Sequence, residues 1–564
     1  RINGARLNRA TQGEEVTPSG KGLLAGKAHS HLHHSHALDI PDTAGAAVRE
    51  RFLRFGRSYR WLLLFSLLCG SLSTMLAATT INVALPSIIG AFGLGQDKAQ
   101  WMSTAFLAAS TVAMLANAWA MSAFGARATY LVALTLFISG SVLGAVSSTF
   151  ELLIVSRAMQ GIAAGLLQPM SMFLIFQTFQ DKMRGSAIGI FSIGVVLAPA
   201  FGPALGGIAV DLSSWRLVFI ATVPIALLAL PLAALLMPER DSIRGTKAPP
   251  LDWVGLLLIA VAVVGLLSTI ANGDRDGWYS DKALFRLAIS LLAGALFFWW
   301  EQRHPFPALN LNVFRHWQFA SAGVVIAFTG TAIYGSTYLI PIFVQIVQHY
   351  SPTAAGVMMI PAGLAMVVGF PVAGRLSDRF DARLLLAFGV TCFGLSMYLM
   401  AGVASATPYW TLVAWIILSR IGISFSMPPA NTTAIRGVPA SLLASAAGAA
   451  SFLMQVGGAF GVSLLAILLQ RRNVFHGEHL SSAMTESNPE LLYQHQQNMW
   501  AAIANGEPFQ QAHMSAFGPI ADAVRREAMV LAFRDCFLVC SIGFAVALAF
   551  ILLMPEPENK SAQA

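Results

Sequence analysis

Long apolar runs, separated by short polar loops, recur along the chain from about residue 60 to about residue 555. Runs of about 20 apolar residues are typical of transmembrane α-helices. The pattern predicts fourteen spans in groups of six, two and six. The predicted spans are 61–90, 100–122, 127–147, 152–179, 186–210 and 216–237, then 253–272 and 283–301, then 319–347, 354–377, 383–403, 409–433, 442–470 and 529–553. We therefore predict an all-α polytopic membrane protein with two six-helix bundles and two inserted helices.

The grouping of the spans also predicts the domain organisation. Residues 1–57 are polar and lack a helical apolar stripe, so we expect an unstructured N-terminal tail. Its histidine-rich segment at 29–36 has the side chains to bind a divalent metal, but an unstructured tail or a gene-start artefact is the alternative, and we predict no metal site. The other predicted divisions are an N-terminal bundle (58–237), the inserted helices (238–301), a C-terminal bundle (302–555) with a long periplasmic loop (471–528), and a cytoplasmic tail (556–564).

The composition excludes a large soluble protein. Of all residues 56% are hydrophobic and 11% are charged, whereas soluble domains carry about 25% charged residues. A membrane β-barrel is excluded as well, because its strands would be alternating segments of about 10 residues. The net charge of +8 lies in the short loops between spans, which argues against a nucleic-acid partner.

The basic residues of the short loops predict the orientation, because Lys and Arg accumulate on the cytoplasmic side. If the N-terminus is cytoplasmic, the cytoplasmic short loops and tails hold eighteen basic residues and the opposite short loops hold five. We therefore expect both termini in the cytoplasm of a multi-pass inner (plasma) membrane protein.

Neither a metal nor a nucleotide cofactor is predicted. The four cysteines lie in or beside apolar spans, and none has metal-ligand spacing with a second cysteine and histidines. No glycine-rich loop ends in Gly-Lys-Ser/Thr, so we predict no nucleotide-binding loop of that kind. We find no catalytic cluster and predict that the protein is not an enzyme.

Arg157 lies inside the fourth span, where a charge is costly and commonly functional. Two roles are open at this point. The arginine is either functional, or it is structural and satisfied by backbone carbonyls. Arg420 in the twelfth span is a second buried-charge candidate.

The fifth span contains VVLAPAFGPALGG, from Val195 to Gly207. Ala198, Gly202 and Gly206 recur every four residues and share one face, and small residues at that spacing let membrane helices pack closely. Pro199 and Pro203 lie beside them and bend the helix. The stretch is either a gating contact or a static kink.

Several segments resemble the major facilitator superfamily, in particular its fourteen-span drug:proton antiporter branch. They are TTINVALPSI (79–88), RAMQGIAAG (157–165), GVVLAPAFGPALGG (194–207), SSWRLVFIATVPIAL (213–227), LDWVGLLL (251–258) and LIPIFVQIVQHYSPTAAGVMMIP (339–361). The resemblance implies a role in coupling or in the substrate path for Arg157 and Gln160. It also implies that Asn82 and Gln345 are candidate site residues, because both lie in family-like segments. It also implies a gating hinge at Pro199, Gly202, Pro203, Gly206 and Gly207.

Two positions bear on conformational control and ion coupling. The segment GRLSDRFDAR resembles the family's cytoplasmic latch. In it, Asp378 would cap the next helix and pair with Arg379 or Arg383. The matching positions of the first half are Ser122 and Ala123, which carry no charge. The family's usual first-span aspartate is Ala77 here, and no acid or histidine lies deep within a predicted span. Titratable candidates remain at span edges: Glu151, Asp211 and Asp535.

We therefore expect a secondary exporter of hydrophobic or amphipathic compounds that works by alternating access, as an ion-coupled antiporter. Its partners would be the small-molecule substrate and membrane lipid. The alternatives are a dedicated exporter of one metabolite, such as a siderophore, that uses a different ion or is uncoupled, and a non-transporting membrane sensor. An apolar stripe from Met514 to Ala528 predicts a helix that docks either on the transporter itself or on a partner, for which the family suggests a periplasmic adaptor protein.

Overall fold

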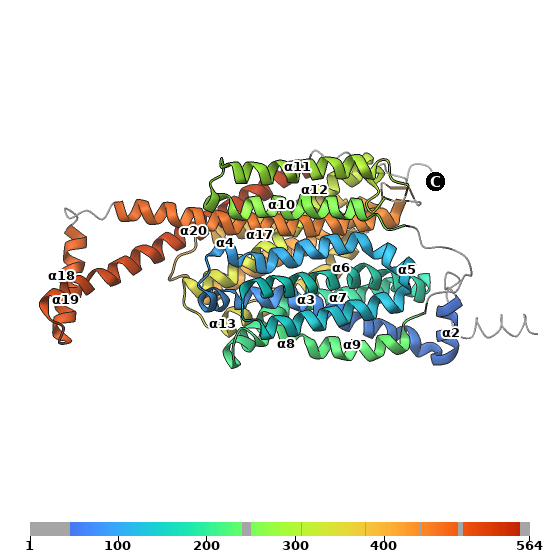
Figure 1. The fold of residues 1–564 in the computed structure, drawn as a ribbon, viewed down its shortest axis with the longest axis horizontal. Coiled ribbons are helices and arrows are strands. Elements are labelled where there is room, and N and C mark those ends of the chain that lie inside the picture. The colour runs from blue at the N-terminus through green and yellow to red at the C-terminus, as the bar shows by residue number, and fades with distance from the viewer. Residues whose placement is uncertain are drawn as a thin grey trace, which may run out of the picture.

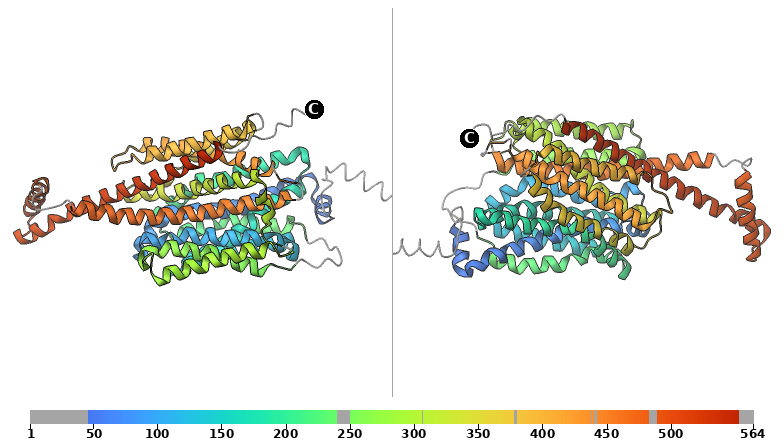
Figure 2. Two further views of the ribbon diagram at one scale, coloured as in Figure 1. Left: turned by 90° about the horizontal axis from the view of Figure 1, so that it is seen from above. Right: turned by 180° about the vertical axis from the view of Figure 1, so that it is seen from behind.

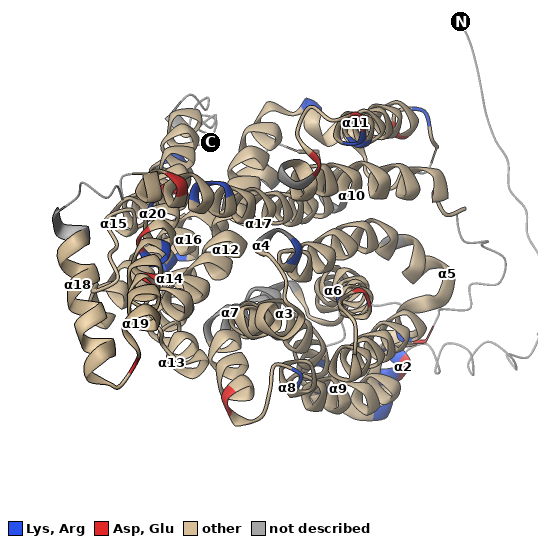
Figure 3. Cartoon of the chain, turned by 60° about the vertical axis from the view of Figure 1, so that its left-hand side comes forward, with Lys and Arg blue, Asp and Glu red and all other residues tan. Residues whose placement is uncertain are grey.

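The computed structural model describes residues 46–239, 250–305, 307–377, 380–436, 438–439, 442–482 and 489–552. All regular secondary structure in these ranges is helical, which confirms the predicted all-α class (Figure 1). Twelve helices among the described residues are long and apolar enough to cross a membrane. Figure 3 shows charged residues on short stretches of ribbon only, so most of each long helix is uncharged.

One set of helices comes from the first part of the chain, and we call it the N-terminal group. Its members are α3 (Tyr59–Phe92), α5 (Trp101–Val146), α6 (Phe150–Thr178), α7 (Asp181–Leu212), α8 (Leu217–Ala221) and α9 (Val223–Leu236). In this group α3 packs against α7 and α9, and α5 packs along α6. A short helix, α4 (Gln96–Ala99), connects α3 to α5.

A second set comes from the last part of the chain, and we call it the C-terminal group. Its members are α12 (Trp317–Ile346), α13 (Pro352–Val357), α14 (Ile360–Ser377), α15 (Ala382–Met400), α16 (Tyr409–Arg436), α17 (Leu443–Ser482) and α20 (Phe517–Leu552). Between the groups in sequence lie α10 (Trp253–Asp276) and α11 (Asp281–Glu301), which pack against each other. Because α10 also contacts α5 and α17, the inserted pair touches both groups along their outer side (Figure 2).

Helix α5 consists of two helices that meet at Gly125. This glycine has φ 82° and ψ 160°, a backbone conformation that side chains with a Cβ rarely adopt. The Thr129 hydroxyl donates to the carbonyl oxygens of Ala120 (3.0 Å) and Gly125 (2.9 Å), so the chain turns sharply there. The break that the sequence predicts between the spans 100–122 and 127–147 is therefore one tight glycine turn.

The expected N-terminal tail is helical at its end. Helix α2 (Ala46–Phe55) lies within the predicted tail of residues 1–57, and its Val48 and Phe52 are buried. The Phe52 ring meets Tyr59 edge to face, with 5.0 Å between centroids. An unstructured tail is thus wrong for residues 46–55, because two apolar side chains in a polar stretch are enough to anchor one short helix. The histidine-rich segment lies outside the described residues.

The predicted long loop at 471–528 is largely helical and forms an arm. We define the arm as residues 471–482 of α17, α18 (Pro489–Ala504), α19 (Phe509–Ser515) and residues 517–528 of α20. Helix α17 has 40 residues, which at 1.5 Å per residue is about 60 Å, or twice the thickness of the hydrocarbon core. The arm projects beyond the other helices at the end of the molecule opposite to α2 (Figure 1). We call these two ends the arm end and the α2 end.

The buried apolar side chains join the two groups at the arm end. One cluster, which includes Phe52, Tyr59 and Leu63, stays within α2 and the N-terminal group. A larger cluster begins at the arm-end half of α3, with Ile81 and Leu85, and continues through the C-terminal group. The apolar core is therefore continuous between the groups at the arm end.

We predict that Phe52→Ala lowers the free energy of unfolding by about 3 kcal/mol, because it removes a fully buried ring. Leu53→Ala, at an exposed position of the same helix, should change it little. Denaturant titration of both purified variants in mixed micelles measures the difference. Equal stabilities of the two variants would mean that α2 does not anchor to the bundle.

Candidate functional site

A buried arginine on α6 connects three helices of the N-terminal group. Arg157 is 1% exposed, and its Nε donates to the Met102 carbonyl oxygen of α5 at 2.8 Å. Its Nη1 donates to the Ala77 carbonyl oxygen of α3 at 3.1 Å and to Gln160 Oε1 at 2.6 Å. A charge inside a bundle is stable only if it is paired or hydrogen-bonded, and here neutral oxygens supply the bonds.

The surroundings fix the orientation of this guanidinium. Gln160 Nε2 donates to the Ser141 hydroxyl at 2.9 Å, which holds Oε1 toward the arginine. The Phe106 ring lies 4.6 Å from the Arg157 Cζ, a favourable cation–π distance. A Cβ on Gly161 would overlap the Phe106 carbonyl, so only glycine lets α5 and α6 approach closely here.

One donor of the arginine is left over. Arg157 Nη2 is buried and has no hydrogen-bond partner among the described residues. The contacts with Met102 and Ala77 match the structural alternative of the sequence analysis. The unused donor, however, gives the same side chain a free position for a hydrogen-bond acceptor from a ligand.

At the position of the aspartate that the family resemblance predicts in the first span, a backbone carbonyl bonds to the arginine. Arg157 reaches the backbone of Ala77, the position where the family resemblance leads one to expect a carboxylate. No carboxylate pairs with Arg157 in the part of the chain that the structure describes. The arginine therefore bonds to position 77 through a carbonyl, which does not titrate.

The small residues of α7 face two different neighbours. A Cβ on Gly202 would overlap the Thr79 side chain, and a Cβ on Gly206 would lie 2.5 Å from the Thr80 carbonyl oxygen, so both glycines face α3. The Thr79 hydroxyl also donates to the Ala198 carbonyl oxygen at 3.2 Å. This face of the stretch packs within the N-terminal group. Pro199 lies in α7, but its side chain is not among those described.

Gly207 and Pro203, in contrast, face the C-terminal group. A Cβ on Gly207 would overlap the Pro352 carbonyl oxygen of α13. A Cβ on Gly356 would overlap the Pro203 carbonyl oxygen in turn. The two backbones are therefore in direct contact, and only glycine at both positions permits it.

Hydrogen bonds between the two groups lie at the same end as this contact. Two predicted site residues, Asn82 and Gln345, lie at this end. Asn82 bonds within the N-terminal group, where its Oδ1 accepts from the Ser103 hydroxyl at 2.9 Å. The bonds between groups join the Thr104 and Ser463 hydroxyls (3.0 Å), Gln345 Nε2 and the Val83 carbonyl oxygen (3.1 Å), and the Thr353 N–H and Asp211 Oδ2 (2.9 Å). In this state, polar contacts and close backbone packing join the groups at the arm end.

The predicted latch residues are only partly described. Asp378 and Arg379 lie outside the described residues. The residue that caps α15 is Asp381, whose Oδ1 accepts from the backbone N–H of Arg383 at 3.0 Å. The expectation that Asp378 caps this helix is therefore wrong, because Asp381 is nearer to the first turn. Arg383 Nη2 is buried and has no partner among the described residues.

The second buried arginine, Arg420, bonds to side-chain hydroxyl groups, which the sequence analysis did not predict. Arg420 on α16 is 2% exposed and donates to the Ser336 hydroxyl at 3.0 Å and to the Thr337 hydroxyl at 3.2 Å on α12. A signal for it was present in the sequence. The dipeptide Ser-Arg at 156–157 of α6 recurs at 419–420 of α16, with one copy in each group.

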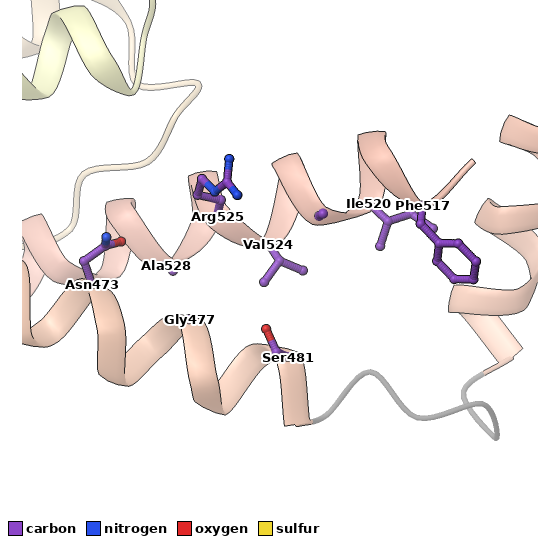
Figure 4. A pocket seen from close by; sticks show the side chains of 9 residues that line it. Asn473, Gly477, Ser481, Phe517, Ile520, Val524, Arg525 and Ala528 are labelled. Atoms are coloured by element: carbon purple, nitrogen blue, oxygen red, sulfur yellow. The ribbon is translucent and has the colours of Figure 1, made fainter. Parts of the chain in front are cut away.

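The arm carries a groove between its two long helices. Phe517, Ala521, Val524 and Ala528 of α20 face Asn473, Gly477 and Ser481 of α17 around a space of about 450 Å³ (Figure 4). The apolar stripe predicted from Met514 to Ala528 thus lines the α20 side of this groove, and its Phe517 also meets His495 of α18, with 4.3 Å between the ring centroids. Its first residue, Met514, lies on α19 and is exposed.

Comparison with known proteins gives one family and many relatives. A family model described as Major Facilitator Superfamily matches residues 67–462. Multidrug export protein EmrB of Haemophilus influenzae is 28% identical over 505 residues, which cover 88% of this chain and 96% of the relative. Multidrug resistance protein Stp of Mycobacterium tuberculosis is 27% identical over 487 residues, 86% of this chain and 89% of the relative. An uncharacterized MFS-type transporter of Bacillus subtilis, YhcA, is 26% identical over 486 residues, 86% of this chain and 91% of the relative.

Solved structures share the fold at low sequence identity. The crystal structure of a bacterial homolog of the human lysosomal transporter Spinster, inward-facing and unoccupied, superposes with a TM-score of 0.58 at 17% identity. The superposition covers 88% of this chain and 97% of that one. A peptide transporter POT in complex with sulfate gives a TM-score of 0.55 at 17% identity and covers 91% and 98%.

We predict that Gly207→Ala separates α7 from α13, because the new methyl group must displace the Pro352 carbonyl. Spin labels at the exposed positions Leu212 and Val357, in a background without the four native cysteines, should report longer distances in this variant.

The matched control is Gly374→Ala, where a Cβ meets nothing within 4 Å. It should leave the label distances unchanged. Identical distance distributions for Gly207→Ala and the unsubstituted protein would show that α7 and α13 accommodate the methyl group without separating.

Proposed function

The chain belongs to the Major Facilitator Superfamily, and from this premise we propose that it exports hydrophobic or amphipathic organic compounds, such as drugs, as a secondary active transporter. It is a multi-pass transporter of the inner (plasma) membrane. The observation that carries the proposal is the match, over 86% or more of the chain, to proteins named for multidrug export or resistance.

The proposed architecture has fourteen spans with both termini in the cytoplasm. The twelve long apolar helices do not include two further segments that are long enough to span a membrane. These are the Trp101–Ala118 half of α5 and most of α7. With these two, the spans fall into six (58–237), two (238–301) and six (302–555). The α2 end is then cytoplasmic, and the arm is periplasmic.

Alternating access would proceed by movement of one group against the other. The continuous core and the hydrogen bonds at the arm end support a state that is closed to the periplasm. We propose that substrate binds between the groups, within reach of Arg157, and that export requires the Gly207–Pro352 and Pro203–Gly356 contacts to separate. Gly202 and Gly206, which face α3, would keep α7 with its own group during this step.

Arg157 would bind the substrate or carry the coupling. Its unused Nη2 donor and its fixed guanidinium plane suit a hydrogen-bond acceptor on a ligand. Gln160 would hold the arginine in position through Ser141. We propose ion-coupled antiport, in which the titrating group is not at position 77.

A dedicated exporter of a single metabolite, with a different ion or without coupling, is the second candidate. The observation that favours it is the Ala77 carbonyl in place of a titratable side chain at the arginine. The breadth of resistance separates the two candidates.

The other proposed partners are lipid and a periplasmic adaptor protein. The inserted pair exposes large apolar side chains, including Leu257, Phe285 and Leu292, which suit acyl chains. The arm exposes Phe475, Trp500 and Phe509, and with its groove it provides an apolar surface outside the membrane for an adaptor.

We predict that production of the protein in efflux-deficient cells raises resistance to several unrelated hydrophobic compounds, and that Arg157→Ala abolishes this resistance. Arg157→Lys should rescue poorly, because an ammonium cannot reach Met102, Ala77 and Gln160 with the fixed fork of a guanidinium. Minimal inhibitory concentrations across a drug panel, together with membrane levels of each variant, measure the effect.

Arg54→Ala, at an exposed position of α2, is the control and should retain resistance. Resistance to one compound only would favour the dedicated exporter. Full resistance of a well-expressed Arg157→Ala variant would reduce the arginine to a packing role.

We also predict that Val524→Asp, which places a charge in the groove, lowers resistance of cells but leaves uptake into reconstituted vesicles unchanged. The reason is that a docked adaptor is needed only in the cell envelope. Ala523→Asp, at an exposed neighbouring position outside the groove lining, is the control. Loss of transport in vesicles as well would place the groove in the transport cycle itself.

A further inference from the structure

Two buried carboxylates meet where the inserted pair ends, far in sequence from Arg157. Asp252 is 5% exposed and precedes α10, and Glu301 is 3% exposed and is the last residue of α11. None of the ion pairs among the described residues involves either of them. Neither residue takes part in the candidate site described above.

Each carboxylate uses one oxygen to hold the local structure. Asp252 Oδ1 caps α10 by accepting from the Gly255 N–H at 2.8 Å, and it also accepts from Trp300 Nε1 of α11 at 2.8 Å. Glu301 Oε2 accepts from the N–H of Leu309 at 3.3 Å, in the connection that leads to α12. These bonds tie α10, α11 and the connection to the C-terminal group together.

The second oxygen of each carboxylate has no partner. Asp252 Oδ2 and Glu301 Oε1 are both buried without a hydrogen bond to the described residues. They converge on one point above Gly255, where a Cβ would overlap Asp252 Oδ2 and lie 2.9 Å from Glu301 Oε1. Glycine at this position leaves room for both oxygens beside its Cα.

Among the described residues, the basic side chains near this site form no ion pair with the two carboxylates. Arg303 lies over the Trp299 ring, with its Cζ 4.4 Å from the ring centroid, and Arg315 is exposed. His304 stacks on Trp300 at 5.6 Å between centroids, so this indole lies between the imidazole and Asp252. The charged side chain that faces Glu301 from α10 is Asp252.

We propose that Asp252 and Glu301 form a proton-binding site, in which one proton is shared between Asp252 Oδ2 and Glu301 Oε1. Two carboxylates of like charge that are close together and buried do not both ionise readily, and a proton between them turns the repulsion into a hydrogen bond. The proton would satisfy both unpartnered oxygens at once. This inference does not depend on the substrate or on the direction of transport.

The site would make one junction sensitive to acidity. Loss of the proton leaves two like charges in a buried space, and their repulsion strains the junction where α10, α11 and the connection at Leu309 meet. Because α10 contacts both groups and this connection leads into α12, the protonation state would affect how firmly the inserted pair is attached to the C-terminal group.

Infrared spectroscopy of the purified full-length protein without substrate tests the proposal. We expect a protonated-carboxyl C=O band near neutral pH, which shifts on hydrogen–deuterium exchange and disappears as the pH rises. Glu301→Gln should abolish this band. Asp252→Asn should retain the helix cap and lower the pH midpoint of the band by at least about one unit, since the like charge is gone.

Asp281→Asn, at an exposed position on α11, is the matched control and should leave the band and its midpoint unchanged. Absence of the band from the unsubstituted protein, or its persistence in both variants, overturns the proposal. Abolition of the band by micromolar Ca²⁺ or Mn²⁺ also overturns the proposal, because the site would then hold a metal cation. If Glu301→Gln does not fold, the midpoint shift of Asp252→Asn decides.

Discussion

The N-terminal group is organised around the hydrogen bonds of one buried guanidinium. Arg157 lies on α6 but bonds to backbone carbonyls of α3 and α5, so three helices share one charge. Such a charge would be unstable in an apolar interior without these bonds, and the helices must therefore keep the spacing that the bonds require. Gly161 and Gln160 follow from this constraint: the glycine brings α5 close enough, and the glutamine orients the fork.

The relation between the two groups depends on a different kind of contact. At the arm end, glycines on α7 and α13 allow backbone to touch backbone, and an apolar core runs across the boundary. Contacts of this kind gain dispersion energy over many atoms and contain few side chains that must change rotamer. They can therefore separate and re-form as units, as the movement proposed above requires.

The sequence predicted the helical class and singled out the buried arginine, because both leave strong local signals: apolar runs of spanning length, and a charge inside one of them. Other features depend on contacts that local patterns do not contain. The role of Asp381 as a cap was missed in favour of Asp378, since both are acids near a helix start. The anchoring of α2 rests on Val48 and Phe52, too few residues to form a recognisable stripe. Asp252 and Glu301 lie 49 positions apart at the edges of two predicted spans, and only the antiparallel packing of α10 on α11 brings them together.

The uninterrupted course of α17 and α20 from the membrane region into the arm has a mechanical consequence. A helix of about 60 Å without a break transmits a tilt from one end to the other. Both helices belong to the C-terminal group, so the arm is a rigid lever attached to that group, and at its base Arg471 also lies over the Trp278 ring, with 4.9 Å from Cζ to the centroid. Any rocking of the C-terminal group inside the bilayer then displaces α18 and α19 sideways by an amount that grows with their distance from the pivot. A protein held at the tip would receive a push in every transport cycle, without any contact with the transported compound.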